Sequence, residues 1–115
     1  MENSRRLGEI LKAELKAMQD RHISIGDVRC LGLFGCLELV KDRKAREPLV
    51  PYNAKGKQAL PSKEISKRLM QNGVYSPMRW MFLSVSPPLS ITEEELRHGL
   101  EVVNQALDYA DSLTK

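Results

Sequence analysis

The sequence is poor in aromatic residues and cysteine and has no long apolar run. Of its 115 residues, 5% are aromatic and two are cysteines. No apolar stretch approaches the about 20 residues that a helix needs to cross a bilayer. The first twenty residues are charged and helix-patterned, and they lack the apolar core of a secretory signal. The sequence therefore predicts a cytoplasmic protein with no membrane partner.

Candidate metal ligands and disulfide partners are also few. Cys30 and Cys36 lie in one apolar stretch, and in a reducing compartment we expect both to be free thiols. His22 and His98 are far apart, and no cysteine or histidine spacing matches a zinc pattern. The sequence predicts no metal site.

The charge balance argues against a nucleic-acid partner. Eighteen basic residues outnumber fifteen acidic ones, which gives a net charge of +3, but the two signs alternate along the chain. The densest basic cluster, residues 41–46, contains Asp42 and precedes Glu47. We interpret it as a solvated loop rather than a binding patch.

The length and the hydrophobic content of 42% suit one domain over residues 1–115. Apolar spacing over residues 3–21 predicts an amphipathic helix. Residues 28–40 are apolar and contain glycine, which predicts one long strand or two strands joined at a glycine bulge. Residues 41–61 predict a long surface loop, which is either functional or packs on a part of the protein that is missing from this chain.

The second half of the chain alternates helices and short strands. Ser62 is predicted to cap a helix over residues 63–71 that stops at Gly73. This helix is expected to turn three side chains inward: Ile65, Leu69 and Met70. Residues 74–76 and 81–85 are predicted to be strands on either side of a turn at Pro77.

The last predicted helix starts at a capping box formed by Thr92 and Glu95 and runs to about Ser112. Its inward face is expected to consist of Leu96, Leu100, Val103, Leu107 and Ala110. The order of elements predicts an α+β fold, with a small, mostly antiparallel sheet and helices packed on one face.

Five segments together carry a resemblance to a known family. They are residues 25–34, 38–43, 46–52, 72–75 together with 79–80, and 86–96, the last reading Ser-Pro-Pro-Leu-Ser-Ile-Thr-Glu-Glu-Glu-Leu. Asn3, Leu7-Gly8 and Leu11 also fit the helix that enters the domain in this family. In this order and spacing the chain resembles the C-terminal small domain of class III, pyridoxal-phosphate-dependent aminotransferases. It is most similar to the branch that acts on taurine, β-alanine and other ω-amino acids. Cys30 is a departure, because the family more often has glycine there.

The resemblance implies that the Schiff-base lysine and the groups around the cofactor lie in a large domain and a partner subunit. The lysines of this chain lie in charged helix faces and loops, where no apolar setting would activate one of them. We therefore expect no catalytic and no cofactor-binding residue here. Pyridoxal phosphate is the cofactor of the parent family, and the large domain is the expected partner.

The resemblance also implies a role for one arginine. Members acting on α-amino acids bind the substrate carboxylate through an arginine at the position that is Ser84 here. Members acting on ω-amines use a mobile arginine a little earlier, and Arg79 is the candidate, because its planar fork suits a carboxylate or sulfonate. The alternative is a turn arginine that stacks on Trp80 or pairs with an acid. Trp80 itself is either core or surface facing the large domain, and we expect Arg29 to form a structural ion pair.

Two functions follow as hypotheses. The first is one wall of the substrate pocket of an aminotransferase that moves an amino group from an ω-amine or amino acid to a 2-oxoacid, with the chain inactive alone. The second is a non-enzymatic module that keeps this fold and uses the exposed interdomain face to bind a partner or to form a homodimer.

Overall fold

The computed structural model describes residues 2–74, 76, 78–88 and 90–114, with only the backbone for residues 2–4. The chain order is α1 (Glu2–Arg21), β1 (Ile25–Leu31), β2 (Phe34–Asp42), β3 (Glu47–Pro48), the 3₁₀ helix η1 (Gly56–Ala59), α2 (Leu60–Gln71), β4 (Met78–Arg79), β5 (Phe82–Val85) and α3 (Glu93–Asp111). None of the described helices is long and apolar enough to cross a membrane.

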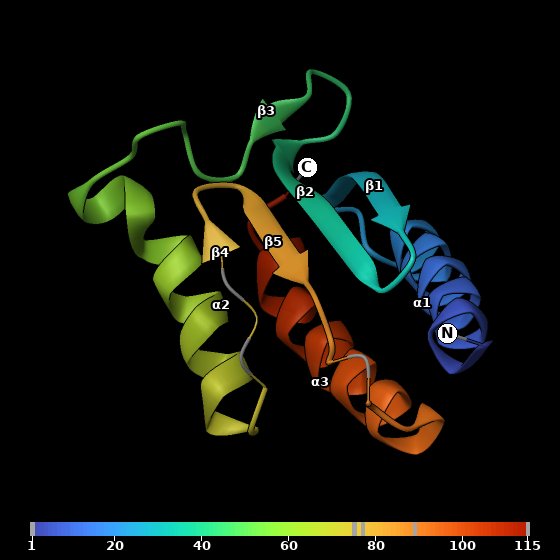
Figure 1. Cartoon of the computed structure of the whole chain (residues 1–115). Helices are drawn as coiled ribbons and strands as arrows, with labels where there is room; N and C mark the ends of the chain where they lie inside the picture. The colour runs from blue at the N-terminus through green and yellow to red at the C-terminus, as the bar shows by residue number, and fades with distance from the viewer. Residues whose placement is uncertain (1, 75, 77, 89, 115) are drawn as a thin grey trace.

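The strands form one small sheet in the order β1-β2-β5-β4, with β3 paired to the end of β2. Every described strand pair is antiparallel. Figure 1 views the sheet from its uncovered side, with α1 and α3 behind it and α2 alongside α3 near β4. The predicted α+β fold is therefore confirmed, and one face of the sheet carries none of the described helices.

The apolar stretch at residues 28–40 is a hairpin. β1 and β2 are joined by the two-residue turn Gly32-Leu33, in which Gly32 has a φ of 58°. A positive φ at the first turn residue suits the tight hairpin turns that match the twist of the strands. The predicted glycine bulge is wrong, because the glycine forms the turn, and the register shifts instead between Ile25 and Asp27.

Two details of α2 differ from expectation. The helix begins at Leu60, with proline in its first turn, so Ser62 is not the cap. Proline suits this position because its missing N–H would have no helical partner there. Ile65 and Leu69 are buried as predicted, but Met70 is 59% exposed, since it lies about 100° around the helix from Leu69. Gly73, with a φ of 80°, follows the helix end as predicted.

The predicted strand at residues 74–76 is wrong for Val74 and Ser76, which lie outside any strand; Tyr75 and the predicted turn residue Pro77 lie outside the described residues. The short strand β4 comes later instead, and β5 confirms the strand predicted at 81–85 from Phe82 onward. The turn between them is Trp80-Met81.

The loop at residues 41–61 is only partly a surface loop. β2 extends to Asp42, the short strand β3 pairs back onto it, and Leu49 and Val50 are buried in the core. This segment therefore packs back onto the sheet, because its two apolar residues gain burial there.

One core lies between the sheet and the helices. α3 starts at the predicted capping box, in which Thr92 and Glu95 hydrogen-bond each other's backbone N–H. Its predicted inward side chains are all buried, from Leu96 to Ala110. They join the buried faces of α1 and the sheet in a single apolar cluster.

Candidate functional site

The uncovered side of the sheet brings together side chains from four strands. Antiparallel register places alternate residues on the same face. Leu37 and Leu83 are buried and therefore mark the covered face. The residues that alternate with them, and the partners of these residues, lie on the uncovered face: Asp27, Arg29, Leu31, Phe34, Cys36, Glu38, Arg79, Phe82 and Ser84. We call this set the open face.

The open face places Arg79 and Ser84 on one surface. Arg79 of β4 pairs with Phe82 of β5, and Ser84 lies two residues after Phe82 on β5. Arg79 is exposed and Ser84 is half-buried. Ser84 is flanked on β2 by Cys36, which in turn pairs with Arg29 of β1. The two positions that the sequence singled out therefore share a side of the sheet.

Arg29 behaves as expected of a surface ion pair. Its Nε lies 3.3 Å from the Asp27 carboxylate and its guanidinium lies 3.8 Å from Glu38, with the side chain 71% exposed. Exposed pairs of this kind contribute little to stability. Both acids belong to the open face, so the positive charge of Arg29 is partly balanced there.

Arg79 stacks on an aromatic ring. Its guanidinium carbon lies 5.1 Å from the centroid of the Trp80 ring, and the Tyr52 ring packs on the same indole with centroids 4.3 Å apart. No described acidic side chain forms an ion pair with Arg79. The structure thus contains the stacking on Trp80 that was one alternative interpretation of Arg79. The N–H groups at the edges of the Arg79 guanidinium have no described carboxylate to bind.

Trp80 occupies an unusual backbone conformation. Its φ is 51°, a left-handed value that is rare for bulky residues and costs on the order of 1–3 kcal/mol. The ring is half-buried and packs against the edge of the core. Neither the strain nor the contact with Tyr52 was predicted, because both depend on how the β3–α2 segment folds back.

The two cysteines lie on opposite sides of the hairpin. Cys30 pairs with Gly35 on the covered side, whereas Cys36 pairs with Arg29 on the open face. Both are free thiols, as predicted. Burial raises the pKa of each thiol, an effect that the positive charge of Arg29 partly offsets at Cys36. Each thiol is therefore protonated near neutral pH, so neither is an activated nucleophile.

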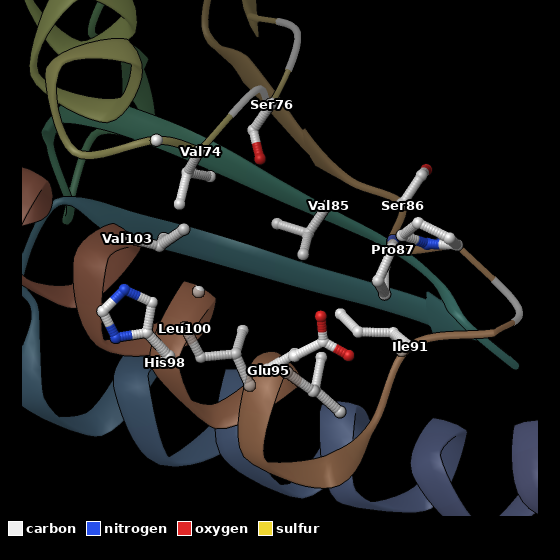
Figure 2. A pocket seen from close by; sticks show the side chains of 14 residues that line it. Val74, Ser76, Val85, Ser86, Pro87, Ile91, Glu95, His98, Leu100 and Val103 are labelled. Carbon is white, nitrogen blue, oxygen red and sulfur yellow. The ribbon is translucent and has the colours of Figure 1, made fainter.

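A separate apolar pocket of about 240 Å³ lies beside α3 (Figure 2). Its described lining is mostly apolar and includes Val74, Val85, Pro87, Leu100 and Val103. The polar groups at its margin include Glu95, which belongs to the capping box, and the exposed His98. Arg79 is not part of this lining, so the pocket and the open face are different features.

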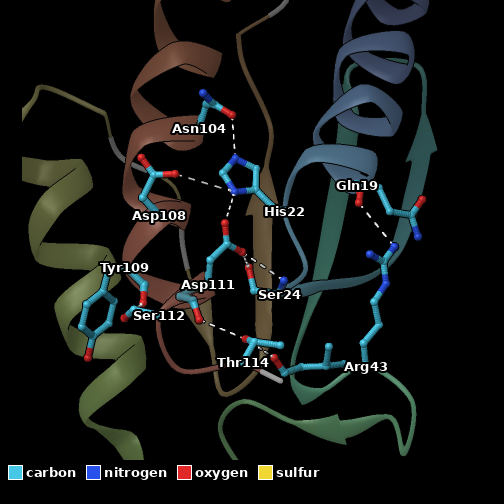
Figure 3. Close-up of polar contacts among 12 residues, drawn as sticks. Gln19, His22, Ser24, Arg43, Asn104, Asp108, Tyr109, Asp111, Ser112 and Thr114 are labelled. Atoms are coloured by element: carbon cyan, nitrogen blue, oxygen red, sulfur yellow. Dashed lines mark hydrogen bonds and ion pairs between the residues drawn. The ribbon is translucent and has the colours of Figure 1, made fainter.

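A buried polar cluster joins the end of α1 to the end of α3 (Figure 3). His22, buried at 4% exposure, contacts Asp111 through Nδ1 at 2.5 Å and Asn104 through Nε2 at 2.6 Å. Ser24 donates from its backbone N–H and its hydroxyl to the other Asp111 oxygen. The sequence offered no signal for this cluster, since each of these hydrogen bonds joins residues more than 80 positions apart.

The same cluster is the one described place where metal-ligand atoms gather. Atoms of His22, Asp108 and Asp111 lie within 4.8 Å of one another. The His22 and Asp111 atoms already hydrogen-bond within the protein, and Asp108 is 74% exposed. This bonding accounts for the arrangement as a structural tie between the two helices.

The described lysines lie outside any protected pocket. A lysine that carries pyridoxal phosphate needs a protected pocket with donors for the phosphate and an acid for the ring nitrogen. Every described lysine is exposed. The described residues therefore do not fit the cofactor by themselves.

The chain is similar in sequence to one family of known proteins. The model of the class III aminotransferase family matches residues 1–107. Ethanolamine-phosphate phospho-lyase homolog 1 of Caenorhabditis elegans is 33% identical over 107 residues, which is 93% of this chain and 22% of that protein. Taurine–pyruvate aminotransferase of Rhodobacter capsulatus is 49% identical over 49 residues, which is 43% of this chain and 11% of that protein.

Solved structures agree with the fold. The taurine:2-oxoglutarate aminotransferase of Bifidobacterium kashiwanohense, solved with PLP and glutamate, superposes with a TM-score of 0.86 at 32% identity. The superposition covers 96% of this chain and 24% of that one. The chain thus spans about a quarter or less of the length of these relatives.

Fold and open face define the class: a two-layer α+β domain that presents one uncovered sheet surface with an arginine on it. The chain belongs to the class III aminotransferase family, whose members use pyridoxal phosphate. One relative in this family is named a phospho-lyase, so membership alone does not fix the reaction.

Proposed function

We propose that residues 1–115 form a single small domain that provides one wall of the substrate pocket of an aminotransferase. The remaining protein supplies a large domain with the Schiff-base lysine and the phosphate donors. The cofactor provides the electron sink for moving the amino group, and this chain contributes substrate binding. We place the whole protein in the cytoplasm and expect this chain to be inactive alone.

Arg79 is proposed to bind the acidic group of the amine donor. The observation that carries this proposal is the shared side of Arg79 and Ser84 on the open face. Ser84 offers no charge to an α-carboxylate, whereas the Arg79 guanidinium has no described carboxylate partner. Both features favour a donor whose acid lies at the far end from the amine, such as taurine, β-alanine or γ-aminobutyrate. The acceptor is a 2-oxoacid.

Replacing this arginine tests the proposal in the full-length protein. Arg79→Ala is expected to raise KM for taurine or β-alanine by about 10- to 100-fold, the value of a hydrogen-bonded charge pair. KM for an uncharged amine is expected to stay unchanged. Steady-state kinetics with both donors measure the difference.

Arg68→Ala is the matched control. Arg68 also stacks on an aromatic ring, with its guanidinium carbon 4.7 Å from the Tyr109 centroid, but it lies on α2 and not on the open face. It should leave KM for both donors unchanged. An Arg79→Ala enzyme with an unchanged KM for the acidic donor would refute the role of Arg79.

A second function rests on a different observation. Leu31 and Phe34 face each other at the end of the hairpin, with 84% and 56% of their surfaces exposed. An apolar pair of this kind suits a protein contact. The alternative is therefore a non-enzymatic module that binds a partner or forms a homodimer through the open face. Sedimentation of the isolated chain, with and without Leu31→Ser and Phe34→Ser, separates it from the first proposal.

A further inference from the structure

Three segments that are distant in the sequence meet at the β4–β5 turn. Tyr52 follows β3, Ser62 lies in the first turn of α2, and Trp80 forms the turn itself. The Ser62 hydroxyl donates to the Trp80 carbonyl at 2.6 Å. Tyr52 packs on the indole with ring centroids 4.3 Å apart. The contacts hold both the backbone and the ring of Trp80.

These contacts matter because the backbone of Trp80 is strained. An aromatic residue with a φ of 51° keeps this conformation only when its surroundings enforce it. The hydrogen bond from Ser62 fixes the carbonyl of this residue, and the ring of Tyr52 covers one side of the indole. The guanidinium of Arg79 lies against the same indole, 5.1 Å from its centroid.

We propose that Ser62 and Tyr52 are positioning residues that act through Trp80 to hold the Arg79 guanidinium stacked on the indole. We call this stacked position of Arg79 the parked state. The inference rests on the proposed role of Arg79 in binding the donor's acid. An exposed guanidinium on a half-buried aromatic ring is held weakly, whereas a carboxylate or sulfonate forms charge-assisted hydrogen bonds with it. An acidic donor draws Arg79 off the ring, and an uncharged donor leaves it parked.

The parked state also predicts whether a substitution strengthens or weakens the binding of the acidic donor. A ligand that needs the released arginine binds less tightly in proportion to the fraction that is parked. Loosening the parking contacts therefore strengthens the binding of the acidic donor. General damage to the domain would weaken binding instead, so the direction of the change separates positioning from structural support.

Trp80 is the only tryptophan of the chain, so its fluorescence reports on this cluster. In the isolated chain, Arg79→Ala, Ser62→Ala and Tyr52→Leu are expected to change the emission of Trp80. Ser62→Thr, which keeps the hydroxyl, is expected to retain the wild-type spectrum. Ser66→Ala, one helical turn along α2, is the matched control and should also leave the spectrum unchanged.

Kinetics of the full-length enzyme provide the decisive test. Ser62→Ala and Tyr52→Leu are expected to lower KM for taurine by about two- to fivefold, the value of an exposed cation–π contact. Both should leave kcat for taurine and KM for an uncharged amine unchanged, and Ser62→Thr should restore the wild-type KM.

The outcomes keep the two proposals apart. If Arg79→Ala raises KM for taurine but Ser62→Ala and Tyr52→Leu leave it unchanged or raise it, the parking inference is overturned and the role of Arg79 stands. If Arg79→Ala leaves KM for taurine unchanged, the role of Arg79 falls, and the inference falls with it. Unchanged Trp80 emission in Arg79→Ala would overturn the stacking contact itself.

Discussion

At the scale of single residues, Asp111 makes the connections with the greatest structural consequence. One of its oxygens accepts two hydrogen bonds from Ser24, and the other contacts the buried His22. These groups tie the end of α3 to the segment between α1 and β1. Buried donors that lose their acceptor keep the cost of leaving water without the compensating bond.

Asp111→Ala is accordingly expected to lower the free energy of unfolding by about 1–3 kcal/mol. Asp108→Ala is the matched control on the same helix. Its carboxylate is 74% exposed and 3.9 Å from His22, so its loss should cost less than about 0.5 kcal/mol. Urea denaturation of the isolated chain measures both, and equal losses would contradict the structural role of the cluster.

Single-residue roles were predictable from sequence only where a motif carries them. The Thr92–Glu95 capping box follows from a spacing of three residues along one chain. The His22 cluster and the Tyr52–Trp80 contact join residues that are far apart, so only the folded chain reveals them. Ser62 shows the limit: a plausible helix cap in the sequence bonds to the β4–β5 turn instead.

At the scale of elements, α1 and the β1–β2 turn approach each other closely at a glycine. A Cβ added at Gly8 would lie 2.9 Å from the backbone carbonyl group of Gly32. Backbone atoms cannot move aside as a flexible side chain can. The helix and the hairpin therefore need glycine at this contact.

Gly8→Ala is expected to destabilise the chain by about 1–3 kcal/mol, because α1 must shift away from the turn. Gly99→Ala in α3 is the contrasting variant, because a Cβ there meets nothing within 4 Å. It should stabilise by about 0.5–1 kcal/mol through the higher helix propensity of alanine. Thermal unfolding of the two variants gives the signs, and a stabilising Gly8→Ala would contradict the close approach.

The capping box of α3 makes stability depend on pH. The pKa of the Glu95 carboxyl lies below its ordinary value of 4.5, because the Thr92 backbone N–H donates to the carboxylate. A lowered folded-state pKa contributes stability that is fully present above the unfolded pKa. This contribution is lost as the pH falls through the folded-state value.

Glu95→Gln should therefore flatten the loss of stability below pH 4.5, measured by urea denaturation from pH 6 to pH 3. Glu94→Gln, on the same helical turn, leaves the capping box intact and should keep the wild-type profile. If Glu95→Gln and the wild type lost stability in parallel, the carboxylate would not be the group that links the cap to pH.

Element prediction succeeded where periodicity and caps were long and local. α1 and α3 each repeat their apolar stripe over several turns, and both were found where predicted. The strand predicted at residues 74–76 is absent at the described residues Val74 and Ser76, because so short a segment has no periodicity to distinguish it from extended loop. The hairpin at Gly32 depends on pairing between strands, which the apolar run alone does not specify.

At the scale of the whole molecule, the uncovered sheet is the feature that a lone domain would not be expected to expose. Its exposed Leu31 and Phe34 lie on the same side as Arg79 and Ser84. A surface that combines apolar residues with an arginine suits both a docked domain and an acidic substrate. The fold class and the family could be predicted from sequence, because the motifs occur in the right order over nearly the whole chain. The share of the relatives' length that the chain spans came only from comparison.

The measurement that tests the central claim most directly is a titration of the purified 115-residue chain with pyridoxal phosphate. Absorbance is followed, and the mixture is then reduced with borohydride and analysed by mass spectrometry. A chain that forms only one wall of the pocket should show no saturable aldimine band and no single preferred lysine adduct, because its described lysines are exposed. A saturable band with one modified lysine would contradict the account and place a complete cofactor site within this chain.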